Sequence, residues 1–211
     1  MGKPQKILTT GLWILAVMGM LLFLALSSAN RNRKQQASMQ EQQKPQPSDA
    51  SKPLFELPKF KLLNQDGKEF TDDQLRGKPF VACFVFTHCA GPCPMMFGKM
   101  AKMQATVPNP NVKLVSFTVD PERDTPAVLK EKAKELGAED GRWFFLTGDK
   151  DSVQKVLRDM LQPKPQEGDD PLMHDTHFYL FDKNGSCVAR YSINDADEMA
   201  KLAKDADALA K

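Results

Sequence analysis

A continuous apolar run at residues 80–86, Phe-Val-Ala-Cys-Phe-Val-Phe, constrains the fold more than any other feature of this sequence. Its aromatic and β-branched members favour a strand, and no polar residue alternates with them. This pattern is typical of a central strand that is buried on both faces. The sequence therefore predicts a sheet whose two faces are both covered.

Strand and helix patterns alternate after this run. Further strands are expected at residues 111–119 and 143–146, and helices at residues 98–106, 127–136 and 152–160. Upstream, residues 54–63 predict a strand that ends in the turn Asn-Gln-Asp-Gly at 64–67.

The last part of the chain predicts a different connection. Residues 177–181 and 186–191 flank a turn at 182–185, which favours an antiparallel hairpin, and a helix is expected from about residue 195. Alternating units closed by a hairpin and a helix predict an α/β fold, a thioredoxin-like three-layer α/β/α sandwich with a mixed central sheet.

The N-terminal segment has the pattern of a membrane anchor. Residues 7–29 contain no charged side chain, and roughly 20 apolar residues in a helix cover a hydrocarbon layer of about 30 Å. We expect one transmembrane helix within residues 1–30. The alternative is a signal peptide cleaved after Ala29, where small residues precede the cut. Both interpretations place the rest of the chain outside the cytoplasm.

Residues 31–52 are rich in Gln, Ser, Lys and Pro and nearly free of apolar side chains, so we expect a flexible linker there. Residues 53–211 then form one domain of ordinary size. The chain has 29 Lys and Arg against 27 Asp and Glu. This near balance of charge argues against a nucleic-acid partner, and none is expected.

Two cysteines follow the apolar run in the arrangement Cys-x-x-x-Cys. Cys89 and Cys93 lie where the predicted strand gives way to a helix, with Pro94 near the helix start. The N-terminus of a helix stabilises a thiolate and lowers its pKa. Such a pair can exchange disulfides, or it can hold a soft metal such as copper.

The segments around these residues resemble the Sco/SenC family of membrane-anchored copper chaperones. The resemblance is carried by Phe-Thr-His-Cys-x-x-x-Cys-Pro at 86–94, Val-Asp-Pro-Glu-Arg-Asp-Thr-Pro at 119–126, Trp-Phe-Phe-Leu-Thr-Gly at 143–148, and a distal His before a strand and turn. It covers roughly residues 55–191 and agrees with the predicted anchor.

The resemblance implies that copper, as Cu(I), Cu(II) or both, is bound by Cys89, Cys93 and a distal histidine. Counting back from the turn at Gly185, the histidine segment of the family falls on residues 174–176, which makes His174 the third ligand. The family delivers copper to the dinuclear copper centre of cytochrome c oxidase. The implied location is the inner (cytoplasmic) membrane, with a single span and the domain on the non-cytoplasmic side.

The two other histidines have weaker claims to a metal. His177 lies three residues after His174 and would point to the opposite face of a strand, so we expect a surface or packing role for it. His88 directly precedes Cys89, and we expect it to be structural; the alternative is that it tunes the thiol pKa or orients the loop.

Further sulfur atoms invite a metal interpretation. Met96, Met100 and Met103 are spaced as one face of a helix, which favours a core stripe over a set of thioether ligands. Cys83 lies in the apolar run and Cys187 in the predicted hairpin, and neither has a metal-like spacing. We expect all five side chains to be structural.

Asp120 and Asp124 form the remaining polar pair of interest. They could act as paired carboxylates in acid–base chemistry, but the intervening Pro and Arg favour a turn followed by a helix cap. Asp124 or Thr125 is the expected cap, with Pro126 at the first helical position.

Three alternatives to a copper chaperone remain open. The first is a thiol-disulfide oxidoreductase in which Cys89 and Cys93 are the attacking and resolving cysteines, and it needs no His174. The second is a relative of the peroxiredoxins, for which no convincing Thr and Arg set is present. The third is an anchored interaction domain in which the two cysteines form a structural disulfide. The enzymatic status is thus undecided from the sequence, and a non-enzymatic chaperone is favoured.

Overall fold

The computed structural model describes Met18 and residues 53–161 and 175–211. The predicted linker and all of the predicted anchor except Met18 lie outside this part of the chain, as does His174. Among the described residues, no helix has the length and apolar character needed to cross a bilayer.

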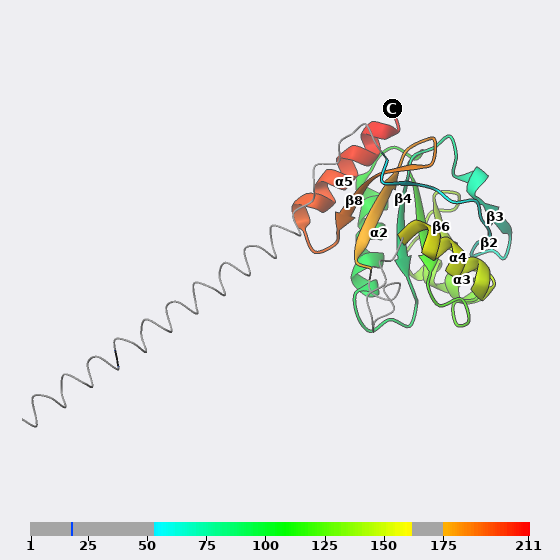
Figure 1. Cartoon of the computed structure of the whole chain (residues 1–211). Coiled ribbons are helices and arrows are strands. Elements are labelled where there is room, and N and C mark those ends of the chain that lie inside the picture. The colour runs from blue at the N-terminus through cyan, green and yellow to red at the C-terminus, as the bar shows by residue number, and fades with distance from the viewer. Residues whose placement is uncertain (1–17, 19–52, 162–174) are drawn as a thin grey trace, which may run out of the picture. The chain divides into compact units, whose positions relative to one another are not determined.

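The described residues form a six-stranded mixed sheet with helices on both faces (Figure 1). In spatial order the strands are β1 (Phe55–Glu56), β8 (Ser186–Ser192), β7 (His177–Phe181), β4 (Phe80–Val85), β5 (Lys113–Thr118) and β6 (Trp143–Leu146). The pairs β4–β5 and β5–β6 are parallel, whereas β4–β7, β7–β8 and β8–β1 are antiparallel. The expected α/β fold with a mixed central sheet is confirmed.

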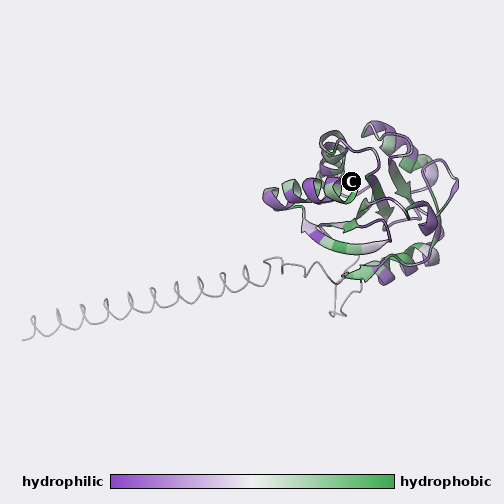
Figure 2. Cartoon of the chain, turned by 90° about the horizontal axis from the view of Figure 1, so that it is seen from above, coloured by the Kyte–Doolittle hydropathy of each residue, from purple (hydrophilic) through white to green (hydrophobic). Residues whose placement is uncertain are grey.

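The helices are α2 (Cys93–Thr106), α3 (Pro126–Glu135), α4 (Lys150–Leu161) and α5 (Ala196–Leu209). Side chains of α2, α3 and α5 pack on one face of the sheet, and those of α4 pack on the other. Figure 2 shows the central strands as mainly hydrophobic and the helices as mixtures of hydrophobic and hydrophilic residues. The helices thus turn an apolar stripe to the sheet and a polar one to solvent.

Strand β4 is buried along its whole length, as its apolar run predicts. Because successive side chains of a strand point to opposite faces, β4 contributes to both cores. Val81, Cys83 and Val85 join the core under α2, and the alternate residues Phe80, Ala82 and Phe84 join the core under α4.

The strand expected at 54–63 is wrong as a single element. It is divided into β1, which pairs with β8, and β2 (Lys61–Leu63), which pairs with β3 (Glu69–Thr71) in a separate two-stranded sheet. Pro58 lies between the two parts and has no N–H to continue a ladder. The short β3 and the 3-10 helix η1 (Asp72–Gln74) that follows it were not predicted.

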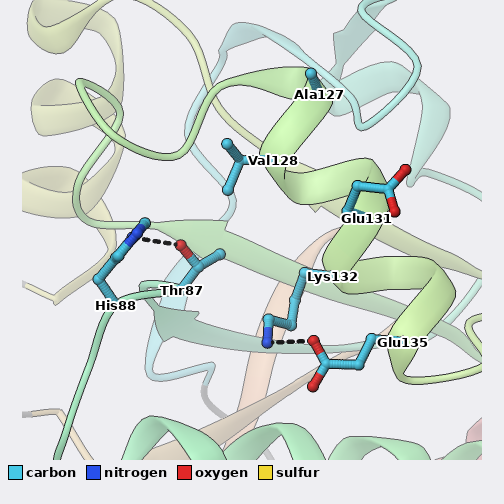
Figure 3. A pocket seen from close by; sticks show the side chains of 7 residues that line it. All are labelled: Thr87, His88, Ala127, Val128, Glu131, Lys132 and Glu135. Carbon is cyan, nitrogen blue, oxygen red and sulfur yellow. Dashed lines mark hydrogen bonds and ion pairs between the residues drawn. The ribbon is translucent and has the colours of Figure 1, made fainter.

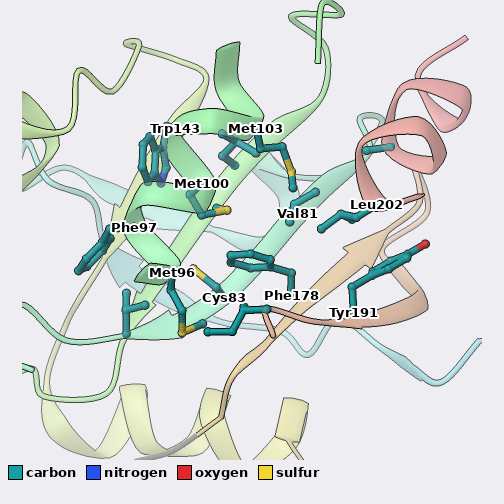
Figure 4. Packing of buried hydrophobic residues seen from close by; sticks show 14 of the residues in the cluster. Val81, Cys83, Met96, Phe97, Met100, Met103, Trp143, Phe178, Tyr191 and Leu202 are labelled. Carbon is teal, nitrogen blue, oxygen red and sulfur yellow. The ribbon is translucent and has the colours of Figure 1, made fainter. Parts of the chain in front are cut away.

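The methionine stripe belongs to the core, as predicted. Met96, Met100 and Met103 are buried on the face of α2 that packs against the sheet, where Figure 4 shows them among Val81 and Phe178. Cys83 and Cys187 are also fully buried. None of these five sulfur atoms is placed to meet a metal from solvent.

Candidate metal centre

The two motif cysteines lie beyond the carboxyl ends of two neighbouring parallel strands. Strand β4 leads into the thiol loop (residues 86–92), which carries Cys89, and Cys93 is the first residue of α2. Strand β5 leads into the β5–α3 loop (residues 119–125), and Val119 N–H donates to the carbonyl oxygen of Val85 at 3.0 Å. Crevices at this edge of an α/β sheet are common binding sites.

The two thiols differ in their surroundings. Cys93 is only 4% exposed and packs in the core under α2, whereas Cys89 is partly exposed. The N–H group of Gly91 donates to the sulfur of Cys89 at 3.3 Å. Both thiols are free, so the pair is available for metal binding or disulfide exchange.

This difference separates the pKa values of the two thiols. Partial burial acts to raise the pKa of Cys89, but hydrogen bonds from the thiol and N–H of Cys93 and from the N–H of Gly91 outweigh it, and the pKa is lowered. Burial raises the pKa of Cys93 to about 12, and the nearby charges of Cys89 and Asp124 act in the same direction. The pair therefore loses its first proton more easily than an ordinary thiol and keeps its second proton.

The donor chemistry of this pair fits a soft metal ion. Cysteine sulfur is the ligand that Cu(I) prefers, and a metal would replace the remaining proton of the pair. In residues 53–161 and 175–211, no group of three His, Cys, Asp or Glu side chains is arranged to hold a metal. The predicted third ligand, His174, lies outside the described residues, so its place in the site stays a prediction.

The other two histidines make local contacts. His88 Nδ1 lies 2.9 Å from the hydroxyl of Thr87, one residue before it. His177 begins β7, is partly exposed, and has its Nδ1 2.7 Å from an oxygen of Asp175.

Asp124 lies beside the thiol loop, although the sequence assigned it only to a turn or a cap. It is 1% exposed, and its carboxylate accepts hydrogen bonds from Thr87 N–H, from the Thr87 hydroxyl and from the Thr118 hydroxyl. The cap of α3 is Thr125, whose hydroxyl accepts from Val128 N–H. Only the parallel pairing of β5 with β4 shows that Asp124 lies beside the thiol loop, and no sequence signal pointed to this.

Asp120 does not share a site with Asp124. Its carboxylate pairs with the guanidinium of Arg123 at 2.5 Å, and its N–H donates to the hydroxyl of Thr118. The two carboxylates therefore have separate partners, and the arrangement does not favour an acid–base pair. The predicted role of Asp120 in the turn agrees with its carbonyl accepting from Asp124 N–H.

An open pocket of about 480 Å³ lies between the thiol loop and α3 (Figure 3). Thr87 and His88 line one side of it, and α3 contributes the other. The α3 residues are Ala127, Val128, Glu131, Lys132 and Glu135. Lys132 and Glu135 are paired at 2.6 Å, and Glu131 leaves this wall with one net negative charge.

Comparison with known proteins identifies the family of the chain. Residues 48–210, most of the chain, match the SCO1/SenC family. The chain belongs to the SCO1/SenC family. A SCO1 protein homolog of Bacillus subtilis (strain 168) is 34% identical over 143 residues, which are 65% of this chain and 74% of the relative.

Solved structures of the family share the fold. A SCO1/SenC family lipoprotein from Bacillus anthracis str. Ames is 35% identical with a TM-score of 0.66, covering 76% of this chain and 99% of that one. Bradyrhizobium japonicum ScoI with copper bound is 28% identical with a TM-score of 0.59, covering 74% and 99%. BsSco, described as having a disulfide switch and as a member of the Sco family of cytochrome c oxidase assembly proteins, is 30% identical with a TM-score of 0.60, covering 75% and 97%.

Proposed function

We propose that this protein is a copper chaperone that binds copper through Cys89 and Cys93, with His174 as the third ligand, and delivers it to the copper-site subunit of cytochrome c oxidase. The observation that carries the proposal is the free dithiol at the start of α2, in which one thiol has a lowered pKa. Its support from relatives is that ScoI of Bradyrhizobium japonicum holds copper and that BsSco belongs to a family of oxidase assembly proteins.

The arrangement suits a carrier that must release its cargo. Cys89 is partly exposed, so a ligand of the partner protein can reach the copper and replace its sulfur. Cys93 is buried and holds its position. Thiolate ligands favour Cu(I), and an added imidazole would extend binding to Cu(II). Copper is thus cargo: on its transfer the two sulfurs keep their oxidation state, and the pair takes up the proton that the metal had replaced.

We further propose where the protein works. The apolar segment within residues 1–30 anchors it as a single span in the inner (cytoplasmic) membrane, and residues 31–52 link this anchor to the domain. The domain, with the thioredoxin-like fold expected for the family, then lies on the non-cytoplasmic side. Fusion of a reporter enzyme that is active only outside the cytoplasm to Lys211 tests this orientation, and an inactive reporter in a stable fusion would contradict it.

Copper binding is tested with the full-length protein in detergent. The reduced protein is loaded with Cu(I) or Cu(II), and stoichiometry and absorption spectra are compared for wild type, Cys89→Ala, Cys93→Ala and His174→Ala. We expect about one copper per chain in wild type, loss in both cysteine variants, and weakened Cu(II) binding with a changed spectrum in the histidine variant. His177→Ala is the matched control and should retain the wild-type spectrum. Absence of tight copper binding in wild type would refute the proposal.

A second function, thiol-disulfide exchange, is favoured by the separated pKa values of the pair. The Cys89 thiolate would attack a partner disulfide, form a mixed disulfide and release one partner thiolate. Cys93 would then lose its proton and attack the Cys89 sulfur, so that a Cys89–Cys93 disulfide forms and the second partner thiol leaves reduced. The partner gains the two electrons that the pair loses.

His174→Ala separates the two functions. If thiol-disulfide exchange is the main activity, this variant reduces a disulfide substrate at the wild-type rate, and copper binding is weak in the variant and in wild type. If the protein is a chaperone, the same variant loses Cu(II) affinity.

A further inference from the structure

We propose that Asp124, acting through Thr87, is a positioning residue that holds the thiol loop in the conformation that binds copper. The inference rests on the proposed function of Cys89 and Cys93. It concerns a carboxylate on a different loop, 37 positions from Thr87 along the chain.

The Asp124 carboxylate is fixed by hydrogen bonds. It is buried, and a buried carboxylate is stable only when hydrogen bonds replace its water. One oxygen accepts from the Thr118 hydroxyl at 2.6 Å and from Thr87 N–H at 3.1 Å, and the other accepts from the Thr87 hydroxyl at 2.5 Å. The carboxylate thereby joins the end of β5 to the start of the thiol loop.

Thr87 depends on this carboxylate for its position more than Thr118 does. Thr118 is the last residue of β5 and is paired with Val85 in the parallel ladder, so the sheet holds its backbone. Thr87 lies beyond the end of β4, and its N–H donates to Asp124. Both the backbone and the side chain of Thr87 are therefore anchored by one group.

The Thr87 hydroxyl also determines which ring nitrogen of His88 carries a proton. The Thr87 hydroxyl has one proton, which it donates to Asp124, so at its 2.9 Å contact with His88 it must accept from Nδ1–H. Nδ1 therefore carries a proton, and among the neutral tautomers only the Nδ1–H form fits this contact. Figure 3 shows His88 joined to Thr87 at the side of the pocket. The network thus fixes both residues that precede Cys89.

Hydrogen bonds behind a metal site can act on metal affinity as well as on folding. A hydrogen bond that orients a ligand typically changes metal affinity or activity by about 10- to 100-fold, and we take the lower end for a bond that orients the loop carrying Cys89. If Asp124 served only folding, removal of the Thr87 hydroxyl and removal of the Thr118 hydroxyl would change copper affinity equally. The proposal instead predicts that only the partner in the thiol loop matters for copper.

The test compares Thr87→Val with Thr118→Val, since each removes one hydroxyl donor to the same carboxylate. Full-length protein in detergent is titrated with Cu(I) in competition with a chromophoric chelator, and thermal unfolding is measured in parallel. We expect both variants to unfold at lower temperature, but Cu(I) affinity to fall about tenfold or more only in Thr87→Val. Thr87→Ser restores the hydroxyl and should recover most of the affinity.

A second readout uses the copper-free protein. The ¹⁵N shifts of the His88 ring, measured by NMR at a pH where the ring is neutral, should report the Nδ1–H tautomer in wild type and Thr118→Val. In Thr87→Val they should shift toward the Nε2–H tautomer.

The outcomes separate the inference from the proposed function. Equal copper affinity in the two valine variants, or an unchanged His88 tautomer in Thr87→Val, overturns the positioning role while wild-type copper binding leaves the chaperone function intact. A wild-type protein that binds no copper refutes the proposed function, and the positioning role in copper binding with it.

Discussion

Replacing Cys93 tests whether the thiol pair is organised as the structure indicates. The Cys93 thiol and N–H groups around Cys89 together hold the pKa of Cys89 below its ordinary value. Cys93→Ala removes the thiol donor, whereas Cys93→Ser keeps a donor of similar size. We therefore expect the pKa of Cys89 to rise in the alanine variant and to stay at or below the wild-type value in the serine variant.

The magnitude follows from one hydrogen bond to a charged group. Such a bond contributes about 1.5–3 kcal/mol, and because S–H is a weak donor and Cys89 is partly exposed, the lower end applies. One pKa unit corresponds to about 1.4 kcal/mol. The pKa of Cys89 should thus rise in Cys93→Ala, and below that pKa the thiolate fraction should fall about tenfold.

The assay is the rate of alkylation by iodoacetamide between pH 5 and pH 10, followed by mass spectrometry of the peptide that contains Cys89. Only the thiolate reacts, so the pH at half-maximal rate gives the pKa. Cys83 and Cys187 are buried and have pKa values raised to about 12, so they contribute little background. The same pKa in wild type and both variants would refute the stabilisation of the Cys89 thiolate by Cys93.

Three further predictions concern stability. Burial raises the pKa of Cys83 from 9.0 to about 12, so its contribution to stability is complete below pH 9 and is lost as the pH rises toward 12. Over this range the free energy of unfolding measured in urea should fall by about 1.4 kcal/mol more per pH unit in wild type than in Cys83→Ala. The same slope against pH in both proteins would contradict this. Met100→Ala should lower the free energy of unfolding by about 2–5 kcal/mol because Met100 is fully buried. Its copper stoichiometry should stay at the wild-type value. A loss of copper at a temperature where the variant is folded would instead make Met100 a ligand. Thr125→Ala removes the cap of α3 and should cost about 1 kcal/mol in thermal unfolding, whereas Thr125→Ser should not.

The sequence determined the elements that depend on local pattern. Each of three elements is marked by residues close together in the chain: the apolar run of β4, the methionine spacing of α2, and the turn residues between β7 and β8. The structure agrees with all three. The prediction failed at residues 54–63, where the apolar pattern continues past Pro58 although the hydrogen-bonded ladder does not. Side-chain periodicity does not reveal which backbone groups have a partner.

The residues of the site likewise include some that local sequence predicts and one that it does not. Only three residues separate Cys89 from Cys93, and their place at a helix start follows from the strand and the prolines around them. Asp124 could not be found in this way, because the segment around it has a complete local explanation as a turn and a helix cap. Only the parallel pairing of β4 with β5 brings its carboxylate to Thr87, and hydrogen bonds between residues distant in sequence exist only once the sheet has formed.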